Sequence, residues 1–533
     1  MSNNRLRLFI YYPIILAIVL AGGIYVGSIL GAGFVPGTVV ESSTGNSRKI
    51  SNLLNYVLEE YVDTVDLDGL TESTIVKMLD QLDPHSSYIP AKDFEASNEP
   101  LEGNFDGIGV EFNIINDTIV VVAPINGGPS EKLGIQSGDR IVTIEDSTIA
   151  GTGITNKDVI SMLRGERGTK VKVGIARRGE AELLTFNIER DKIPIYSVDA
   201  GYMVNDEVGY IKISRFAATT YDEFSEKLLT LKDAGMQSLI LDLRGNPGGY
   251  LTAAIDISDE FLEEDKLIVY TEGRARAKES AYATRNGDFE KGKLVILVDE
   301  GSASASEIVS GAVQDNDRGT ILGRRTFGKG LVQEQVELQD GSAVRLTIAR
   351  YYTPTGRCIQ RPYGEDDDYY GDFMHRIESG ELYEADSISV DESEKFVTPG
   401  GKVVYGGGGI VPDVFVPLDT VPLSKLHTEL LRSGVLREFA VDFASGKRDE
   451  LDQFGDAQQF DAGFKLSKGD FQSLLDFAKK NDVKASGTYA EEAELLNNLK
   501  ALIARSKWNG DGFYPIINKE DEMVKAAIEQ LSN

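Results

Sequence analysis

Two short stretches of this sequence carry residue types that could cleave a peptide bond. The stretch 301–307 alternates small residues with three serines, and the stretch 326–333 holds a lysine between two glycines, with a glutamine four residues later. A serine hydroxyl becomes a useful nucleophile when a neighbouring group takes its proton. Lys329 is the candidate base, because the chain has only three histidines and a histidine-containing triad is therefore not favoured.

The serine-rich stretch fits two interpretations. It follows an apolar run at 293–298 and precedes a helix with one apolar stripe, so its serines lie where the helix dipole and free N–H groups favour negative charge. The N–H of Ala305 could then stabilise an oxyanion. The other interpretation is a helix cap, because Ser304 followed by Glu307 is a capping box. The local pattern leaves three candidate nucleophiles: Ser302, Ser304 and Ser306.

Lys329 needs special surroundings to act as a base. A free lysine has a pKa of about 10.4, and burial among apolar groups lowers that value. Phe327 and Leu331 are apolar neighbours, and the flanking glycines permit close approach of the backbone. If residues 329–338 form a strand, Lys329 and Gln333 share one face and the amide could orient the amine. The alternative is a surface lysine in a hairpin.

A second turn could complete such a site. Residues 244–249 (Arg-Gly-Asn-Pro-Gly-Gly) follow an apolar run at 238–243 that is typical of a buried parallel strand. Ligands bind at the carboxyl ends of strands in open α/β sheets, so Gly248 or Gly249 could present a second oxyanion donor. The alternative is a tight Asn-Pro-Gly turn. His85, in the stretch Asp83-Pro-His-Ser86, could be a base but is interpreted as the end of a helix stopped by Pro84.

Composition limits the partners and cofactors. The 533-residue chain has a net charge of −30, which argues against nucleic acid because nothing would neutralise its phosphates. The single cysteine, Cys358, excludes an internal disulfide and a cysteine-based metal site, and the three histidines lack metal-ligand spacing. We therefore predict neither a metal nor a cofactor.

The N-terminus predicts a membrane anchor. Residues 8–40 carry no charge and follow Arg5 and Arg7. Residues 8–30 alone would span roughly 35 Å as a helix, against a bilayer core of about 30 Å. The arginines place the N-terminus in the cytoplasm, so we expect a single-pass inner-membrane protein with its catalytic body in the periplasm. The alternative is a cleaved signal peptide, for which this apolar run is long.

The rest of the chain changes pattern several times. Short strands with Gly/Pro turns and two helices, one of them around 156–163, indicate a compact, partly open barrel in which 170–176 is a strand. After it, strands such as 208–213 and 293–298 alternate with helices, which predicts βαβ units with a sheet covered on both faces. An acidic stretch then reads as an inserted surface loop, and periodic segments, the first at 424–439, predict a helical tail. The expected regions are 1–45 (anchor), 46–102 (helical), 103–190 (barrel), 191–363 (α/β core), 364–400 (acidic insertion), 401–420 (return strands of the core) and 421–533 (helical).

Together these stretches resemble the carboxy-terminal processing (tail-specific) proteases, serine–lysine peptidases with an embedded PDZ domain. The resemblance covers residues 48–363 and 402–417. It rests on Leu82-Asp-Pro-His-Ser86, the PDZ-like order L-G-I-x-x-G-D-x-I-x-x-I at 133–144, Leu241-Asp-Leu-Arg-Gly-Asn-Pro-Gly-Gly249, Gly301-Ser-Ala-Ser-Ala-Ser-Glu307, Phe327-Gly-Lys-Gly-x-x-Gln333 and Tyr352-Thr-Pro-Thr-Gly-Arg357.

The resemblance implies a role for each of these positions. It implies a core related to the ClpP/crotonase type, with Ser304 as nucleophile, Lys329 as base and Gln333 orienting the lysine. Ala305 and one of Gly248 and Gly249 correspond to the oxyanion donors. The family's PDZ domain captures the substrate C-terminus and gates the active site. Here the resemblance assigns capture to Phe105, Gly107, Ile108, Gly109 and Val110, and a regulatory role in gating to Arg164.

The expected function is a serine endopeptidase that cleaves exported proteins near their C-termini. Its partners would be protein substrates held by their C-terminal tails, since a PDZ groove adds an extended tail as a strand. The alternative is a non-catalytic, membrane-anchored PDZ adaptor, and a third hypothesis is an acyl-thioester enzyme on a similar sheet. An adaptor or activating lipoprotein and a homo-oligomer are left open.

Overall fold

The computed structural model describes residues 44–532 except 285–286, 365–367, 485 and 491. The predicted anchor at 8–30 lies outside the described residues. Within the described ranges, no helix combines the length and the apolar character that a bilayer crossing requires. The chain divides into two compact units, residues 1–77 and 78–533. Helix α2 (Thr44–Glu60) belongs to the first unit, and α3 (Leu67–Leu79) reaches into the second.

A six-stranded sheet forms the core of the second unit. Its order is β10-β11-β12-β15-β16-β21, and every neighbouring pair is parallel except β10 with β11. The predicted bounds 208–213 and 293–298 are confirmed for β11 and β15. The strands are β10 (Val198–Met203), β11 (Val208–Ile213), β12 (Ser238–Asp242), β15 (Lys293–Val298), β16 (Thr320–Gly323) and β21 (Val414–Phe415).

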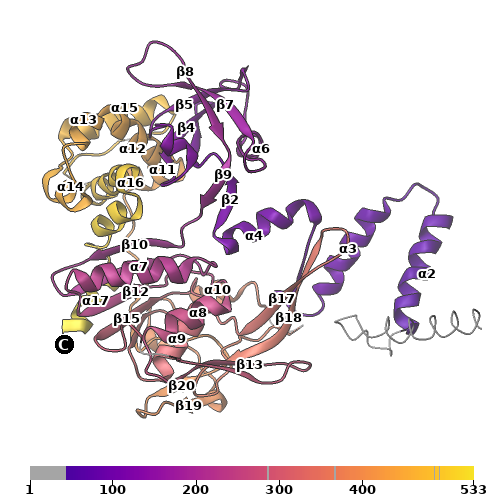
Figure 1. The fold of residues 1–533 in the computed structure, drawn as a ribbon. Helices are drawn as coiled ribbons and strands as arrows, with labels where there is room; N and C mark the ends of the chain where they lie inside the picture. Colours follow the sequence, from indigo (N-terminus) through magenta and orange to yellow (C-terminus); the bar gives the residue numbers. More distant parts are fainter. Residues whose placement is uncertain (1–43, 285–286, 365–367, 485, 491, 533) are drawn as a thin grey trace, which may run out of the picture. The chain divides into compact units, whose positions relative to one another are not determined.

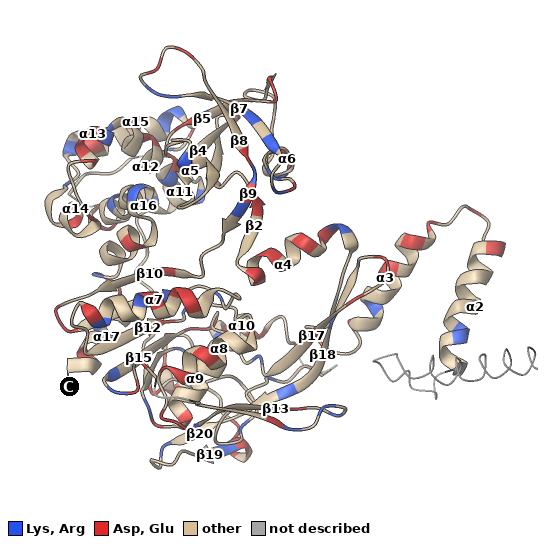
Figure 2. Ribbon diagram, in the orientation of Figure 1, with Lys and Arg blue, Asp and Glu red and all other residues tan. Residues whose placement is uncertain are grey.

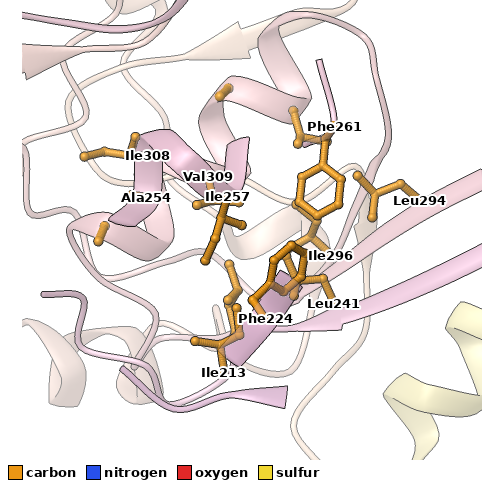
Figure 3. Packing of buried hydrophobic residues seen from close by; sticks show 14 of the residues in the cluster. Ile213, Phe224, Leu241, Ala254, Ile257, Phe261, Leu294, Ile296, Ile308 and Val309 are labelled. Carbon is orange, nitrogen blue, oxygen red and sulfur yellow. The ribbon is translucent and has the colours of Figure 1, made fainter. Parts of the chain in front are cut away.

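Helices cover both faces of this sheet, as predicted. Alternate strand residues such as Leu241 and Ile296 pack against three helices on one face (Figure 3). The intervening residues, among them Ile240 and Val295, pack against a C-terminal helix on the other face. The first three helices are α7 (Thr220–Asp233), α8 (Leu251–Asp259) and α9 (Ala305–Asp315), and the last is α17 (Glu522–Ser532).

A five-stranded antiparallel sheet lies beside these elements in the chain's core (Figure 1). Its central strand β18 pairs with β1, β13 and β17, so segments from residue 87 to residue 352 meet in one sheet. Gln333 faces Thr347 across the β17–β18 pair. The strands are β1 (Ser87–Ile89), β13 (Leu267–Glu272), β14 (Glu279–Tyr282), β17 (Leu331–Glu337) and β18 (Ala343–Tyr352).

A separate sheet forms between residues 110 and 189, in the order β3-β4-β5-β7-β8, with β6 paired to β5. It has its own apolar core, and the predicted helix at 156–163 and strand at 170–176 are observed. The ribbon β2–β9 and helix α4 adjoin it in the chain. The elements are η1 (Ala91–Asp93), α4 (Phe94–Glu102), β2 (Asn104–Gly107), β3 (Val110–Ile115), β4 (Thr118–Pro124), α5 (Pro129–Lys132), β5 (Arg140–Ile144), β6 (Ser147–Thr148), α6 (Asn156–Leu163), β7 (Lys170–Ala176), β8 (Leu184–Glu189) and β9 (Asp191–Pro194).

The acidic insertion 364–400 is at least partly exposed over most of its described part, but it also has residues in the protein interior. Tyr369, Arg376 and Glu381 are only 8%, 3% and 4% exposed. The segment contains a helix and turns that end in a two-stranded ribbon, because its buried charges pair with one another and with the core. Its elements are α10 (Asp372–Glu378), η2 (Ala385–Ser387), η3 (Glu392–Glu394), β19 (Lys395–Val397) and β20 (Val403–Tyr405).

The C-terminal region is helical, as predicted, and has its own aromatic-rich core. The single helix expected at 424–439 is two helices, because Gly434 has a φ of 74° and breaks the repeat. Acidic side chains recur on many elements of the chain, including α3, α4 and α7 (Figure 2). The helices are α11 (Lys425–Arg432), α12 (Val435–Gly446), α13 (Arg448–Leu451), α14 (Ala457–Gly463), α15 (Lys468–Lys480) and α16 (Ala493–Ile517).

Candidate active site

Ser304 sits immediately before α9 in a strained backbone conformation. Its φ and ψ are 55° and −111°, which an L-residue rarely adopts and which costs of order 1–3 kcal/mol. The structure accommodates this because Gly248 lies against it: a Cβ added at Gly248 would come within 2.7 Å of the Ser304 Cβ. The surrounding fold therefore holds this serine in one unusual orientation.

The three candidate serines differ in the hydrogen bonds of their hydroxyl groups and in their exposure. The Ser302 hydroxyl donates to the Leu243 carbonyl at 2.9 Å, and the Ser306 hydroxyl donates to the Asn246 carbonyl at 3.0 Å. Both residues are fully buried, whereas Ser304 is partly exposed. Of the three, Ser304 is thus the serine with exposed surface.

Glu307 connects the serine stretch to the lysine stretch. Its Oε2 accepts hydrogen bonds from the N–H of Ser304 (2.8 Å) and the N–H of Lys329 (2.9 Å). Its Oε1 accepts from the Thr326 hydroxyl (2.5 Å) and the Gly328 N–H (2.8 Å). Burial raises the pKa of Glu307, and these four donors oppose that rise without cancelling it. Glu307 does take part in the predicted cap, and the same carboxylate also holds the lysine loop.

Lys329 and Gln333 meet directly, although Lys329 precedes β17 instead of lying in it. The Lys329 Nζ donates to the Gln333 Oε1 at 3.0 Å. Burial lowers the pKa of Lys329, and the nearby Arg345 lowers it further. Among the described residues, Gln333 and not Ser304 is the hydrogen-bond partner of the ammonium.

The Gln333 amide has a second partner that sequence reasoning missed. Its Nε2 donates to the main-chain carbonyl of His85. His85 lies in a turn held by Asp83, whose Oδ1 accepts the N–H groups of His85 and Ser86, each at 2.9 Å. Burial lowers the pKa of His85 to about 4, and Lys329 contributes to that shift. The interpretation of this stretch as a helix end alone is therefore incomplete.

The candidate oxyanion donors lie beside Ser304 but are not equally available. A Cβ on Gly248 would be 2.9 Å from the Ala305 nitrogen, so the two residues are in contact. The Gly248 N–H donates to the Asn246 Oδ1 at 2.9 Å and is engaged in the Asn-Pro-Gly turn. Ala305 is the first residue of α9, where an N–H has no intrahelical acceptor. Gly249, with a φ of 148°, packs against the Phe216 backbone.

The predicted tail-binding residues lie in the sheet of residues 110–189 and the ribbon beside it. Phe105 and Gly107 belong to β2, and Val110 begins β3. Ile108 is buried, and its carbonyl accepts the Ser130 N–H and hydroxyl. Gly109 has a φ of 74°. No hydrogen bond or ion pair between described residues joins this group to Ser304 or Lys329.

Arg164 links this sheet to α4. Its guanidinium lies 4.5 Å from the centre of the Phe105 ring, and its Nη1 is 2.5 Å from the Glu99 carboxylate. Both contacts are with residues that precede β3 in the chain. The side chain predicted to be regulatory is thus located where the sheet joins the segment leading back to the core.

Three regions of the chain match known protein families. Residues 207–370 match peptidase family S41, residues 107–189 match the PDZ domain, and residues 426–510 match a family of unknown function. A carboxy-terminal-processing protease of Bartonella bacilliformis is 37% identical over 317 residues, which is 58% of this chain and 72% of that protein. The carboxy-terminal processing protease CtpA of Bacillus subtilis is 34% identical over 323 residues, 60% of this chain and 68% of that protein.

Among solved structures, the photosystem II D1 C-terminal processing protease is 27% identical and covers 71% of this chain and 89% of its own. Its TM-score of 0.37 is too low to carry an argument. The sequence relatives are sufficient, because they share a third of their residues over more than two thirds of their own length. The predicted resemblance is confirmed: this chain belongs to the carboxy-terminal processing proteases, serine proteases of family S41 with a PDZ domain.

Proposed function

We propose that Ser304 is the nucleophile of this protease, Lys329 its general base and Gln333 the residue that orients the lysine. The observation that carries the proposal is the Glu307 carboxylate, whose Oε2 binds the backbone N–H groups of both Ser304 and Lys329. One buried carboxylate thereby binds the backbone of a partly exposed serine and of a lysine whose pKa is lowered by burial. A structural cap alone would not need the second contact.

The reaction follows from these positions. Neutral Lys329 takes the Ser304 proton as the Oγ attacks the scissile carbonyl carbon, and the carbonyl becomes an oxyanion. The free N–H of Ala305 stabilises that charge, with Gly249 or a Gly248 released from Asn246 as the second donor. The intermediate then expels the amine, which takes the proton from Lys329, and leaves an ester on Ser304. Water, deprotonated by the same lysine, hydrolyses the ester.

The bond between Lys329 and Gln333 prepares this step. In the structure without substrate the lysine donates to the Gln333 amide and not to Ser304. Catalytic hydrogen bonds are often long before substrate binds and tighten in the complex. Burial lowers the pKa of Lys329, so a larger fraction of the amine is neutral and able to accept a proton at a given pH.

The PDZ region supports capture of substrate tails. Strand β3 is at the edge of its sheet, with β4 as its one neighbour among the described strands, so its other edge could accept an extended peptide. The loop Ile108–Val110 precedes that edge and would hold the terminal carboxylate with its N–H groups. Arg164, in contact with Glu99 and Phe105, would couple occupancy of the groove to the core.

The cellular setting belongs to the same proposal. An anchor at residues 8–30 would place the protease in the inner membrane with its body in the periplasm, where exported proteins present their C-termini. A relation of the core to the ClpP/crotonase type fits its parallel sheet. An adaptor or activating lipoprotein and a homo-oligomer are compatible with this setting.

Cleavage of a tailed protein tests the assignment. We expect the full-length protein to shorten a substrate with an apolar C-terminal tail, as read by mass spectrometry, and Ser304→Ala to reduce the rate by at least about 10³-fold. Ser302→Ala removes a neighbouring buried hydroxyl and should retain cleavage. Cleavage by Ser304→Ala at the wild-type rate would contradict the mechanism. Loss of wild-type cleavage on addition of a chelator would contradict it as well. Tail binding by the wild type without cleavage would favour a PDZ adaptor.

A further inference from the structure

Gln333 has two amide atoms, and the structure gives each a different partner. The Oε1 faces the Lys329 ammonium at 3.0 Å, and the Nε2 faces the main-chain carbonyl of His85. A carbonyl can only accept a hydrogen bond, so the oxygen of His85 fixes which end of the amide points toward the lysine. The orientation of Gln333 is therefore set by a group outside its own strand.

That orientation decides what the lysine can do. When the amide oxygen faces Lys329, a neutral amine donates one of its hydrogens to the oxygen and keeps its lone pair free. The lone pair can then accept the Ser304 proton. With the amide reversed, an N–H of Gln333 would donate to the lone pair and compete with that proton. The His85 carbonyl thus selects the productive form.

The turn that carries the His85 carbonyl is held by hydrogen bonds to the strand that pairs with the strand of Gln333. Asp83 accepts the N–H groups of His85 and Ser86 and, through Oδ2, the Ser86 hydroxyl at 2.6 Å. Thr347 faces Gln333 across the β17–β18 pair. Its hydroxyl donates to Asp83 at 3.0 Å and its N–H donates to the Ser86 hydroxyl at 3.1 Å. The contacts form a closed ring from Gln333 through the turn and back to its own sheet.

The imidazole of His85 is anchored from the other side by the 364–400 insertion. The Nε2 of His85 lies 2.6 Å from the hydroxyl of Tyr369, which is only 8% exposed. The Tyr369 ring also lies 3.9 Å below the guanidinium of Arg361, which in turn covers the ring of Phe327 two residues before Lys329. An element that sequence patterns assigned to solvent therefore reaches the surroundings of the base.

We propose that Asp83, His85 and Tyr369 are positioning residues for Gln333: the turn of residues 83–86 holds the amide with its oxygen toward Lys329, and Tyr369 anchors the turn. This deepens the proposed function and rests on it. None of the three has a hydrogen bond to Ser304 or Lys329 among the described residues, so we expect each to act on the rate mainly through Gln333.

Tyr369→Phe is the sharpest variant, because it removes the hydroxyl and keeps the ring that stacks on Arg361. Loss of one buried hydrogen bond should lower kcat about threefold to tenfold and leave KM unchanged. The matched control is Tyr370→Phe, since Tyr370 is 83% exposed, and it should keep the wild-type kcat. Thermal unfolding of each full-length variant shows whether both fold.

A double-mutant cycle separates positioning from general structure. In a Gln333→Ala background the amide is gone, so Tyr369→Phe should lower kcat no further. Full additivity of the two losses, or a Tyr369→Phe enzyme with wild-type kcat, overturns the proposal. Asp83→Ala is the second variant: it frees the turn and should lower kcat about tenfold to a hundredfold. In the Gln333→Ala background most of that loss should disappear, and what remains reflects the direct effect of the Asp83 charge on the pKa of Lys329.

The same assays distinguish a failure of the proposed function. If Ser304→Ala cleaves as the wild type does, the catalytic assignment fails, and the positioning proposal fails with it. If Ser304→Ala is inactive while the cycle shows additive losses, the protease assignment stands and only the positioning role is overturned.

Discussion

Two buried carboxylates of the core, Asp242 and Glu307, have opposite kinds of hydrogen-bond partners. Asp242, at the end of β12, is 1% exposed and is bound by Lys212 (3.2 Å), Arg244 (2.6 Å) and the Tyr210 hydroxyl (2.6 Å). Glu307 is fully buried and is bound by one hydroxyl and three backbone N–H groups. The first thus has charged partners and the second has neutral ones.

The pKa values follow this difference. Burial acts to raise the pKa of Asp242, but Lys212 and Arg244 outweigh it and hold the pKa below the usual range. Neutral donors do not outweigh burial at Glu307, so its pKa is raised. We infer that Asp242 chiefly neutralises buried cations, whereas Glu307 chiefly fixes the geometry of the two loops that carry Ser304 and Lys329. Substitution of Asp242 should therefore affect mainly stability, and substitution of Glu307 mainly activity.

The largest expected effect is on stability at Asp242. Asp242→Ala leaves the buried Lys212 without its carboxylate partner and Arg244 with Asp521 alone, which costs about 3–5 kcal/mol of unfolding free energy. Glu307→Ala leaves only neutral donors unpaired and should cost less, about 1–3 kcal/mol. Urea denaturation of the two variants measures the difference. Equal losses of unfolding free energy in the two variants would show that charged and neutral partners do not differ in their effect on stability.

The pH dependence of stability sharpens the same contrast. Because the pKa of Asp242 is lower in the folded than in the unfolded chain, its contribution is present above the ordinary Asp value of about 3.9 and is lost as the pH falls below it. The wild type should therefore lose more stability than Asp242→Asn on acidification from pH 5 to roughly pH 2.

The second effect, on activity, concerns Glu307. Glu307→Gln keeps the shape of the side chain but must direct an NH₂ group toward two of the four donors. We expect kcat of the folded protein to fall about a hundredfold, the size of a displaced oxyanion or base contact. Asp242→Asn should change kcat of its folded fraction less. The reverse order would assign loop positioning to Asp242 instead.

A smaller effect is expected at Gln333. Gln333→Glu places a carboxylate against Lys329, which raises the lysine pKa and is repelled by the His85 carbonyl. The acid limb of kcat/KM should move to higher pH, with activity at pH 7 reduced about tenfold or more. Gln335→Glu, on the same face of β17, is the control for added charge, and an unchanged limb in Gln333→Glu would contradict the assigned base.

The smallest effect is a gain in stability. The pKa of Lys329 is lowered in the folded state, so the folded protein disfavours the charged amine at neutral pH. Lys329→Met should raise Tm by roughly 1–3 °C while abolishing cleavage. The gain should shrink as the pH approaches the ordinary lysine value of about 10.4, where the unfolded chain also loses the proton. A lower Tm would mean that the amine stabilises the fold.

The sequence predicted those features that depend on local patterns. The strands at 208–213 and 293–298 and the helix at 156–163 each bury a regular face, and their bounds agree with the structure. The pairing of Lys329 with Gln333 was predicted for a strand at 329–338, and it is observed although the strand begins only at Leu331. Ser304 was singled out among three serines by family resemblance, and burial now gives an independent physical reason for that choice.

Long-range contacts were not predictable. A capping box is a local signal, but the bonds from Glu307 to Gly328 and Lys329 depend on how β15 and β16 pair. The contact of Gln333 with His85 uses a main-chain carbonyl, which leaves no signature in residue types. Tyr369 and Arg376 were hidden in an acidic stretch whose composition indicated solvent, although both are buried.

The double role of Glu307 also has a consequence for the order of folding. Neither residues 301–307 nor residues 326–329 can complete the site alone, because each supplies donors to a carboxylate whose remaining partners lie on the other. Between them lie α9 and β16, which must first pack on the sheet. On the proposed assignment, we therefore expect a newly made chain to lack the serine–lysine pair until its core has closed, so that it does not cleave its own unfolded segments.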